Sequence, residues 1–448
     1  MSNKLQWIIW SLATIGLVTF FAISLTSQPN TVARTFLPGV TTHGHYQIEL
    51  QCSSCHTPGM GVQQDACVKC HGAELKTATD THPKTKFSDP GKAHLLVQLD
   101  ARSCTTCHEE HVPDRTQAMG LSLPDDYCWH CHQEIGEQRP SHKDFAYDSC
   151  ATTGCHNYHD NRALFENFLV AHFGEPDVLD DPSLPRLAYD SSDRTPLNAK
   201  QHDAPDEWNS DAELLSEWAT TAHAKAGVNC TACHSAEDGT WRQQISHDSC
   251  RGCHENQVAG FLAGRHGMRL AADLPPMTPS EARLPMKHSS FHSELTCAAC
   301  HSDHRFDTRF AAVDGCLQCH DDEHSTAYRN SSHFDLWQAE VEGAADPGTG
   351  VSCATCHMPR VEDDDGQLFV QHNQNDNLRP NDKMLRNACG HCHGLQFSLD
   401  ALADIDLINR NFVGESKVHI ESIDMAKAWA DERARLREER KRKRQEKK

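Results

Sequence analysis

The stretch Cys104-Thr-Thr-Cys107-His108-Glu-Glu-His111 contains the pattern that decides the fold of this 448-residue chain. Two cysteines separated by two residues and followed at once by histidine form a c-type haem attachment site. The thiols bond to the two vinyl groups on one porphyrin edge, and the histidine becomes the proximal ligand of the iron. His111 lies three residues later, near the same face of a helical turn. It cannot reach the far side of its own haem, so we expect it to ligate a neighbouring iron.

The same pattern recurs along the chain. Ten sites have the standard spacing: Cys52/Cys55/His56, Cys67/Cys70/His71, Cys104/Cys107/His108, Cys128/Cys131/His132, Cys230/Cys233/His234, Cys250/Cys253/His254, Cys297/Cys300/His301, Cys316/Cys319/His320, Cys353/Cys356/His357 and Cys389/Cys392/His393. A further site, Cys150-Ala-Thr-Thr-Gly-Cys155-His156, has four residues between its thiols. The eleven sites use all 22 cysteines and leave no thiol for a disulfide or a nucleophile. We therefore predict eleven covalently bound c-type haems, each with its iron on the histidine of its site.

Other cofactors also use paired cysteines. Zinc ribbons and iron–sulfur clusters contain Cys-x-x-Cys units, but neither requires a histidine after every second cysteine. The chain has 32 histidines in 448 residues, so eleven histidines in eleven sites are not explained by composition. The pattern favours covalent haem over zinc and iron–sulfur clusters.

The composition alone would indicate disorder. Hydrophobic residues make up 38% of the chain, aromatic residues make up 7%, and the net charge is −21, which is typical of chains that bury no core. Haem reverses this expectation because each porphyrin is a large apolar disc. We expect a mostly α fold with much irregular coil, in which a multihaem cytochrome c wraps around a stacked haem chain and a helix starts within each site. Because thioether attachment occurs outside the cytoplasm, we also expect export.

The charge is unevenly distributed. Residues 427–448 carry eleven Lys and Arg and five Asp and Glu, a net of +6, so the other residues carry −27. An acidic body argues against a nucleic-acid partner and suits a basic redox partner. The basic end is predicted to be a charge-rich helix. It is either a solvated helix or an arm that binds anionic lipid headgroups or an acidic partner.

Residues 7–25 (WIIWSLATIGLVTFFAISL) form an uncharged run of nineteen residues, which is long enough to cross a bilayer as a helix. Lys4 precedes the run, and Trp7 and Trp10 stand where a membrane interface would fall. The alternative is a cleaved signal peptide, but Ala22-Ile-Ser24 is a poor substitute for an Ala-x-Ala site. We predict an uncleaved transmembrane helix that anchors the chain in the lipid bilayer, with the haems on the periplasmic side of the inner membrane.

The haem sites fall into two groups. The predicted divisions are an N-terminal anchor at residues 1–30, a pentahaem module at 31–172, a haem-free linker at 173–213, a hexahaem module at 214–400, and a C-terminal helix with a basic tail at 401–448. The linker is rich in Pro and Asp, as surface segments are. The modules look like imperfect repeats. His45 and His223 each precede a first site by seven residues, and each third site has an added histidine, His111 or His304.

The remaining histidines are candidates for the second iron ligand, because methionines are few and poorly placed. His130 and His391 lie between the thiols of their own sites, and His172, His202 and His419 lie in or near linkers. The better candidates are His45, His82, His94, His111, His142, His159, His223, His247, His292, His304, His324 and His333. Since Met ligation raises the haem potential, a His-dominated set predicts mostly low-potential haems.

The chain resembles the bacterial multihaem c-type cytochromes. The segment Phe36-Leu-Pro-Gly-Val-Thr-Thr-His43-Gly-His45, with the anchor and five haem sites, is similar to membrane-anchored pentahaem subunits of quinol-oxidising complexes. The second module resembles octahaem cytochromes of the hydroxylamine oxidoreductase type through His223-Ala-Lys-Ala-Gly-Val-Asn-Cys230 and Gly350-Val-Ser-Cys-Ala-Thr-Cys-His-Met-Pro-Arg360. The haem count matches neither group, and no site ends in Lys, as the catalytic haem does in some nitrite reductases. The catalytic relatives therefore imply fold more than activity.

Two functional classes remain. The first is a periplasmic electron carrier between a membrane redox complex or quinol dehydrogenase and periplasmic redox proteins or outer-membrane acceptors. The second is an enzyme that converts a small nitrogen or sulfur compound at a haem with an open position. His372, Arg379 and Lys383 are the polar groups to inspect there, unless they are surface residues beside haem propionates. A structural subunit of a respiratory complex is a third possibility. The histidine surplus favours the carrier, with no catalytic residue.

Overall fold

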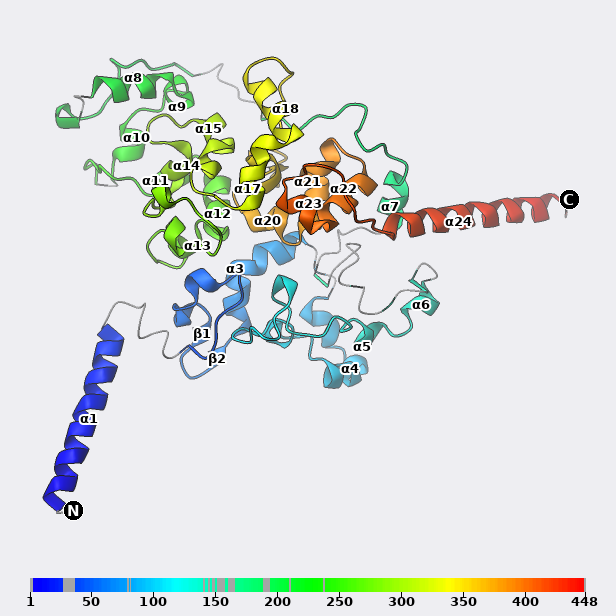
Figure 1. The fold of residues 1–448 in the computed structure, drawn as a ribbon, viewed down its shortest axis with the longest axis horizontal. Coiled ribbons are helices and arrows are strands. Elements are labelled where there is room, and N and C mark those ends of the chain that lie inside the picture. Colours follow the sequence, from blue (N-terminus) through cyan, green and yellow to red (C-terminus); the bar gives the residue numbers. More distant parts are fainter. Residues whose placement is uncertain are drawn as a thin grey trace. The chain divides into compact units, whose positions relative to one another are not determined.

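The computed structural model describes residues 3–26, 37–78, 80, 82–139, 142–143, 146, 150, 158–159, 166–187, 194–208, 211–236 and 238–446. Cys155 and His156 of the wide-spaced haem site lie outside the described residues. The fold class predicted above is confirmed, because short helices and irregular backbone make up most of the described chain (Figure 1).

The helices are distributed along the whole described chain. In the N-terminal part they are α1 (Asn3–Thr26), α3 (Gln64–Thr77), α4 (Ala93–Gln98), α5 (Trp129–His132), α6 (Ile135–Gln138) and α7 (Glu166–His172). After the linker they are α8 (Ala212–Thr220), α9 (Ala222–Lys225), α10 (Thr231–His234), α11 (His247–Arg251), α12 (Glu255–Ala263), α13 (Met268–Ala271), α14 (Cys297–His301), α15 (Thr308–Ala312), α16 (Asp314–Leu317), α17 (Glu323–Ala327), α18 (Ser332–Val341), α19 (Cys353–His357), α20 (Gln374–Leu378), α21 (Met384–Asn387), α22 (Leu395–Ala403), α23 (Ile405–Asn409) and α24 (Ser422–Gln445).

The strands that the structure describes form two small antiparallel hairpins. In one hairpin β1 (His56–Thr57) pairs with β2 (Gly61–Val62), with His56 opposite Val62. In the other β3 (Arg360–Glu362) pairs with β4 (Leu368–Val370), with Val361 opposite Phe369. The first hairpin begins at a proximal histidine and the second begins three residues after one, so each turns the chain back beside a haem motif.

Most haem motifs are built as about one helical turn. In several of them the N–H of the proximal histidine donates to the carbonyl of the first cysteine, at 2.9 Å for His108 and Cys104 and at 2.8 Å for His393 and Cys389. This i→i−4 bond is that of an α-helix. It gathers both thiols and the imidazole on one side of the turn, where one porphyrin can meet all three. The prediction of helix within the sites is met by α-helices at α5, α10, α14 and α19, and by 3₁₀ turns at Cys104–Thr106 and Cys389–His391.

The site of Cys52, Cys55 and His56 differs from the other sites in the backbone at its proximal histidine. A 3₁₀ turn covers Cys52–Ser54 and ends at Cys55, whose N–H donates to the Cys52 carbonyl at 3.2 Å. The next residue, His56, begins β1 instead of continuing a helix. The physical reason is the tight turn that follows, where Gly59 and Gly61 have φ of 75° and 70°, a conformation that glycine adopts without steric cost. A 3₁₀ turn therefore starts within this site, as at Cys104 and Cys389, but it ends before the proximal histidine.

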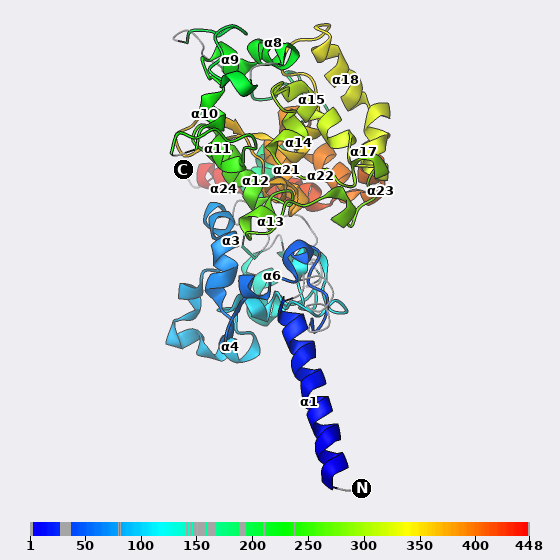
Figure 2. The same ribbon diagram turned by 90° about the vertical axis from the view of Figure 1, so that its left-hand side faces the viewer.

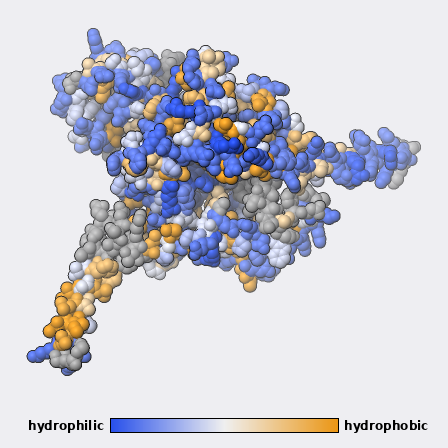
Figure 3. All heavy atoms as spheres, viewed as in Figure 1, coloured by the Kyte–Doolittle hydropathy of each residue, from blue (hydrophilic) through white to orange (hydrophobic). Residues whose placement is uncertain are grey.

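Helix α1 presents mostly hydrophobic residues on the face that Figure 3 shows. Within the described residues it alone is long and apolar enough to cross a membrane, and its span at Asn3–Ala22 buries no side chain against the protein. A membrane anchor has this length and composition, and so does a signal sequence. The structure therefore supports an N-terminal apolar helix of either kind.

The backbone forms two compact units. The first comprises residues 1–69 and 101–123, and the second comprises residues 70–100 and 124–448. The first unit holds the sites of His56 and His108 together with Cys67. The second holds Cys70 and His71, the site of His132, and all six sites from Cys230 onward. The module boundaries predicted from the spacing of the haem sites remain a prediction.

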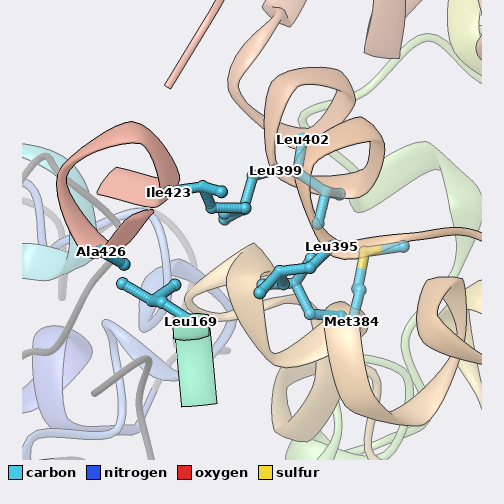
Figure 4. Packing of buried hydrophobic residues seen from close by; sticks show 8 residues of the cluster. Leu169, Met384, Leu395, Leu399, Leu402, Ile423 and Ala426 are labelled. Atoms are coloured by element: carbon cyan, nitrogen blue, oxygen red, sulfur yellow. The ribbon is translucent and has the colours of Figure 1, made fainter. Parts of the chain in front are cut away.

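Two clusters of buried apolar side chains lie in the second unit. The larger contains Leu169, Met384, Leu385, Leu395, Leu399, Leu402, Ile423 and Ala426, and it joins α7, α21, α22 and α24 (Figure 4). The smaller contains Val313, Leu317 and Tyr328. Helix α17 packs against α23 nearby, which both views of the fold show (Figure 1, Figure 2). Both clusters surround haem motifs, since Cys353, Cys356 and Cys389 pack against them.

Candidate haem sites

Imidazole rings from distant parts of the chain face each other in pairs. Among the described residues, eight proximal histidines each have a second histidine ring with its centroid 5.9–6.5 Å away. In the first unit the pair is His56 and His111. In the second unit the pairs are His132/His82, His234/His304, His254/His223, His301/His372, His320/His266, His357/His324 and His393/His333.

This spacing fits an iron ion between the two imidazoles. With a metal–nitrogen bond of about 2 Å, the coordinating nitrogens stand about 4 Å apart and the ring centroids about 6 Å apart. The angle between the ring planes varies from 8° for His234 and His304 to 87° for His82 and His132. A constant distance with a variable angle is expected when an axial ligand pair sets the separation, and is not expected from ring packing. The residues therefore fit haem.

The opposite ring nitrogen of many of these histidines is held by the protein. Nδ1 bonds to a backbone carbonyl in His82 (Tyr158, 2.6 Å), His111 (Gly39, 2.7 Å), His234 (Arg242, 2.6 Å), His324 (Ile408, 2.5 Å), His372 (Val370, 2.8 Å) and His393 (Asp177, 2.8 Å). A histidine that donates from Nδ1 keeps its lone pair on Nε2. This is the arrangement that second-shell partners impose on metal ligands.

Burial lowers the pKa of several of the paired imidazoles. Desolvation, reinforced by the neighbouring ring, lowers the pKa of His266, His301 and His357 to about 4. The pKa values of His333 and His372 are lowered for the same reason. Only the neutral imidazole has a free lone pair for iron. At neutral pH these rings are therefore ready to act as ligands.

The described cysteines are free thiols, and most are partly buried. No disulfide joins any two of the cysteines that the structure describes. Burial raises the pKa of the Cys300, Cys356 and Cys389 thiols to about 12, so they are protonated. Cys150, the described cysteine of the wide-spaced site, contacts Cys128.

The first site also places a thiol next to a proximal imidazole, although its 3₁₀ turn ends before the histidine. Cys52 is exposed and Cys55 is half-buried. Cys55 directly precedes the proximal His56, whose ring faces that of His111 with centroids 6.5 Å apart. A thiol and an imidazole on adjacent residues therefore stand beside a histidine pair, as at the helical sites. The attachment of haem to Cys55 remains a prediction.

Two other proximal histidines are held through Nδ1 as well. In His108 this nitrogen is 3.2 Å from the carbonyl oxygen of Gly120. In His71 it is 3.6 Å from the Glu74 carboxylate, and this contact helps to lower the pKa of Glu74 to about 2. In both residues Nε2 is again the nitrogen left for iron.

The structure brings six of the twelve candidate second ligands to a proximal histidine, namely His82, His111, His223, His304, His324 and His333. The other six have different surroundings. Nδ1 of His45 bonds to Glu110 at 2.6 Å, His159 lies 3.4 Å from Asp80, and His247 lies 3.6 Å from Asp248. His94 and His292 are exposed, and His142 is half-buried. Their roles as ligands remain predictions.

Sequence reasoning missed two of the paired histidines. His266 is absent from the candidates above, and His372 was considered only as a group near an enzyme site. His266 follows His254 by twelve residues, much as His82 follows His71 by eleven, so comparison of the two modules could have found it. His372 lies beyond β4 and has no such signal.

The three residues suggested for an open catalytic site have separate environments. His372 faces His301 with ring centroids 6.3 Å apart. Lys383 forms a 2.9 Å ion pair with Glu74, and Arg379 is exposed. His372 therefore occupies the position where a substrate would need free space.

Comparison with known proteins identifies the class. A family model described as cytochrome c3 matches residues 44–133 and again residues 222–321, and one described as cytochrome c552 matches residues 328–435. This chain is a multihaem c-type cytochrome. A Cytochrome c-552 of Haemophilus ducreyi is 23% identical over 150 residues. The match covers 29% of this cytochrome and 29% of that relative, so the chain spans under a third of the relative's length. No solved structure matches the chain.

Proposed function

We propose that this cytochrome is an electron carrier with eleven covalent haems. It is held on the periplasmic side of the inner membrane by α1, and it passes single electrons from a quinol-linked membrane donor to periplasmic or outer-membrane acceptors. The observation that supports a carrier most strongly is the pairing of histidines. In every site from Cys230 to His393 the proximal histidine faces a second histidine, with ring centroids 5.9–6.4 Å apart.

Two protein ligands on an iron suit electron transfer better than catalysis. When bound, each haem supplies one-electron chemistry between its ferric and ferrous forms. Paired imidazoles would hold each such iron from two sides, and Nδ1 is fixed by a carbonyl in several of them, including His234, His324 and His393. Little rearrangement would then accompany the change of charge. An enzyme must instead leave a position open for its substrate.

The surface charge supports the choice of partners. Outside residues 427–448 the chain carries −27, and an acidic surface attracts basic redox proteins and steers their approach. The same charge disfavours nucleic acid. The apolar α1 supports membrane attachment by its length and composition.

Reoxidation kinetics test the proposal. The full-length, haem-loaded protein is reduced with dithionite, and the haem absorbance is followed after adding nitrite, hydroxylamine or sulfite, and separately after adding a basic soluble c-type cytochrome. The carrier account predicts rapid reoxidation by the protein acceptor and none beyond the buffer rate by the three small compounds. Catalytic turnover of any of the three would replace the carrier with the enzyme.

A further inference from the structure

We infer that the site of Cys389, Cys392 and His393 is the junction at which electrons pass between the first haem group and the second. The first group is the five sites from Cys52 to His156, and the second group is the six sites from Cys230 to His393. From the junction, the second group forms an unbranched series that ends at His234, opposite to the order of the chain. The inference rests on the proposed carrier function. Each step moves one electron from a ferrous site to a ferric neighbour, with no bond made or broken.

An ion pair connects a site of the first group to the region of the junction. Lys383 lies in the turn before α21, six residues before Cys389, and its side chain is only 9% exposed. Its Nζ is 2.9 Å from Oε1 of Glu74 on α3, and Oε2 of Glu74 is 3.6 Å from Nδ1 of the proximal His71. A proximal ligand of the first group is thereby connected to the segment that leads into the site of His393.

The chain that leaves the first group also wraps around the site of His393. Leu179 N–H donates to the carbonyl of Cys392 at 2.9 Å, and Nδ1 of His393 bonds to the Asp177 carbonyl at 2.8 Å. Gly394 is needed here, because a Cβ at this position would overlap the Pro176 carbonyl oxygen. Along the linker, these contacts precede its contacts with every other site of the second group that the structure describes.

Helix α7, which also follows the first group, is anchored at the same place. Leu169 is buried in the cluster with Met384, Leu385 and Leu395 (Figure 4). The Arg386 guanidinium lies 3.9 Å from the ring centroid of Phe168.

Within the second group each site contacts the next site in sequence. The thiols of Cys250 and Cys297 contact each other, and so do those of Cys316 and Cys353. In the three other neighbouring pairs of sites, the second cysteine of the earlier site lies within electrostatic range of both cysteines of the later one. These are Cys233 with Cys250 and Cys253, Cys300 with Cys316 and Cys319, and Cys356 with Cys389 and Cys392. The two kinds of contact alternate from one end of the group to the other.

Hydrogen bonds fix these neighbours in place. Gln318 donates to the carbonyl of Ala299 at 2.6 Å, which joins the site of His320 to that of His301. Asn377 donates to the carbonyl of Cys356 at 2.6 Å and accepts from Asn387 at 3.1 Å, which joins the site of His357 to the segment before Cys389. The series therefore runs His393, His357, His320, His301, His254 and His234.

The linker follows the same series to its far end. Leu184 N–H donates to Gly348, and Arg360 donates to the Pro185 carbonyl at 2.7 Å, both near the site of His357. Further on, Asp203 bonds to Asn229 and Thr231 in the site of His234. The described parts of the linker thus contact the second group from the His393 end to the His234 end.

Cryo-electron microscopy of the full-length, haem-loaded protein in detergent tests this order through iron positions. We expect the iron of His393 to be the second-group iron nearest to the first group, with the other five following in the series above. An iron of His234 nearest to the first group, or a branched series, would overturn the inference. The result does not depend on turnover. If the order holds but nitrite, hydroxylamine or sulfite reoxidises the protein, the junction stands while the carrier function fails.

Discussion

The two haem groups pair their histidines in the same way. One family model matches residues 44–133 and 222–321, and each match includes the first four sites of a group. In both groups the histidine three residues after the third proximal ligand faces the proximal ligand of the first site: His111 faces His56 and His304 faces His234. His111 and His304 also share a left-handed backbone, with φ of 64° and 60°. The third site of each group therefore places a histidine beside the proximal histidine of the first site.

A second pairing of histidines also occurs in both groups. His82 lies between the second and third sites and faces the proximal His132 of the fourth site, and His266 lies between the corresponding sites and faces His320. The two groups differ in what surrounds these ligands. The second group lies within one compact unit and has two apolar clusters, whereas the sites of the first group are divided between the two units. The pairing of these histidines is thus the same in both groups, whereas the packing between sites differs.

The largest effect is expected from removing haem altogether. Expression without the cytochrome c maturation system should give a chain that fails to fold in both groups, because little apolar core remains without porphyrin. Any residual protection from protease should lie in the second group, around Leu169, Leu399 and Ile423. Circular dichroism and limited proteolysis measure this, and intact mass of the mature protein should show eleven haems. A folded, haem-free chain would contradict the account, and ten haems would mean that Cys150 and Cys155 are unused.

Matched variants of His111 and His304 test whether the two groups use equivalent histidines as second iron ligands. His111→Gly and His304→Gly should each convert one low-spin iron to high spin, with the covalent haem count unchanged, because the thioethers are untouched. Glycine is chosen since it accepts the left-handed backbone. Electron paramagnetic resonance measures the spin state, and added imidazole should restore the low-spin signal. Arg305→Ala, beside His304, should have no effect. A change in only one of the two glycine variants would break the comparison.

The histidine that the sequence comparison missed gives a sharper test. His266→Ala should open the haem of His320 and give one high-spin iron. His247→Ala should give none, because its Nε2 faces Asp248 at 3.6 Å. If His247→Ala opens a haem and His266→Ala does not, the pairing in the structure is wrong.

A moderate effect is expected at the contact between Lys383 and Glu74. Lys383→Met should lower the free energy of unfolding by about 1–3 kcal/mol, the usual cost of losing a hydrogen bond to a charged group, and toward the lower end because Glu74 is partly exposed. The ion pair helps to depress the pKa of Glu74 from 4.5 to about 2. Its stabilisation is therefore complete above about pH 4.5 and is lost as the pH falls toward 2. Denaturant unfolding at pH 7 and pH 3 measures this, and an equal loss at both pH values would contradict it.

The smallest effect is expected at His419, which follows the last haem site and has no counterpart in the first group. Asp424 at 2.7 Å and Asp400 at 3.3 Å raise the pKa of His419 above 6.5. This contribution is complete below pH 6.5 and is lost as the pH rises through the higher folded value. His419→Gln should therefore lower the melting temperature slightly at pH 5.5 and not at pH 8.5. A larger loss at pH 8.5 would reverse the sign and contradict the assignment.

The sequence predicts attachment better than ligation, for a physical reason. Cys104, Cys107 and His108 bind one haem within a single turn, so their spacing alone predicts the site. A second ligand such as His372 comes from a distant element, and its position depends on how β4 and α20 pack. The fold class followed from the haem motifs, but the strand after Cys55 depends on pairing with β2. The contact of Lys383 with Glu74 likewise depends on tertiary packing and had no local signal.

The measurement that tests the central claim most directly is a low-temperature electron paramagnetic resonance spectrum of the fully oxidised, haem-loaded protein. Since His/His pairs occupy the described sites throughout the second group, the account predicts only low-spin ferric signals, unchanged by nitrite, hydroxylamine or sulfite. A substantial high-spin signal in the unmodified protein that shifts when one of these compounds is added would contradict it.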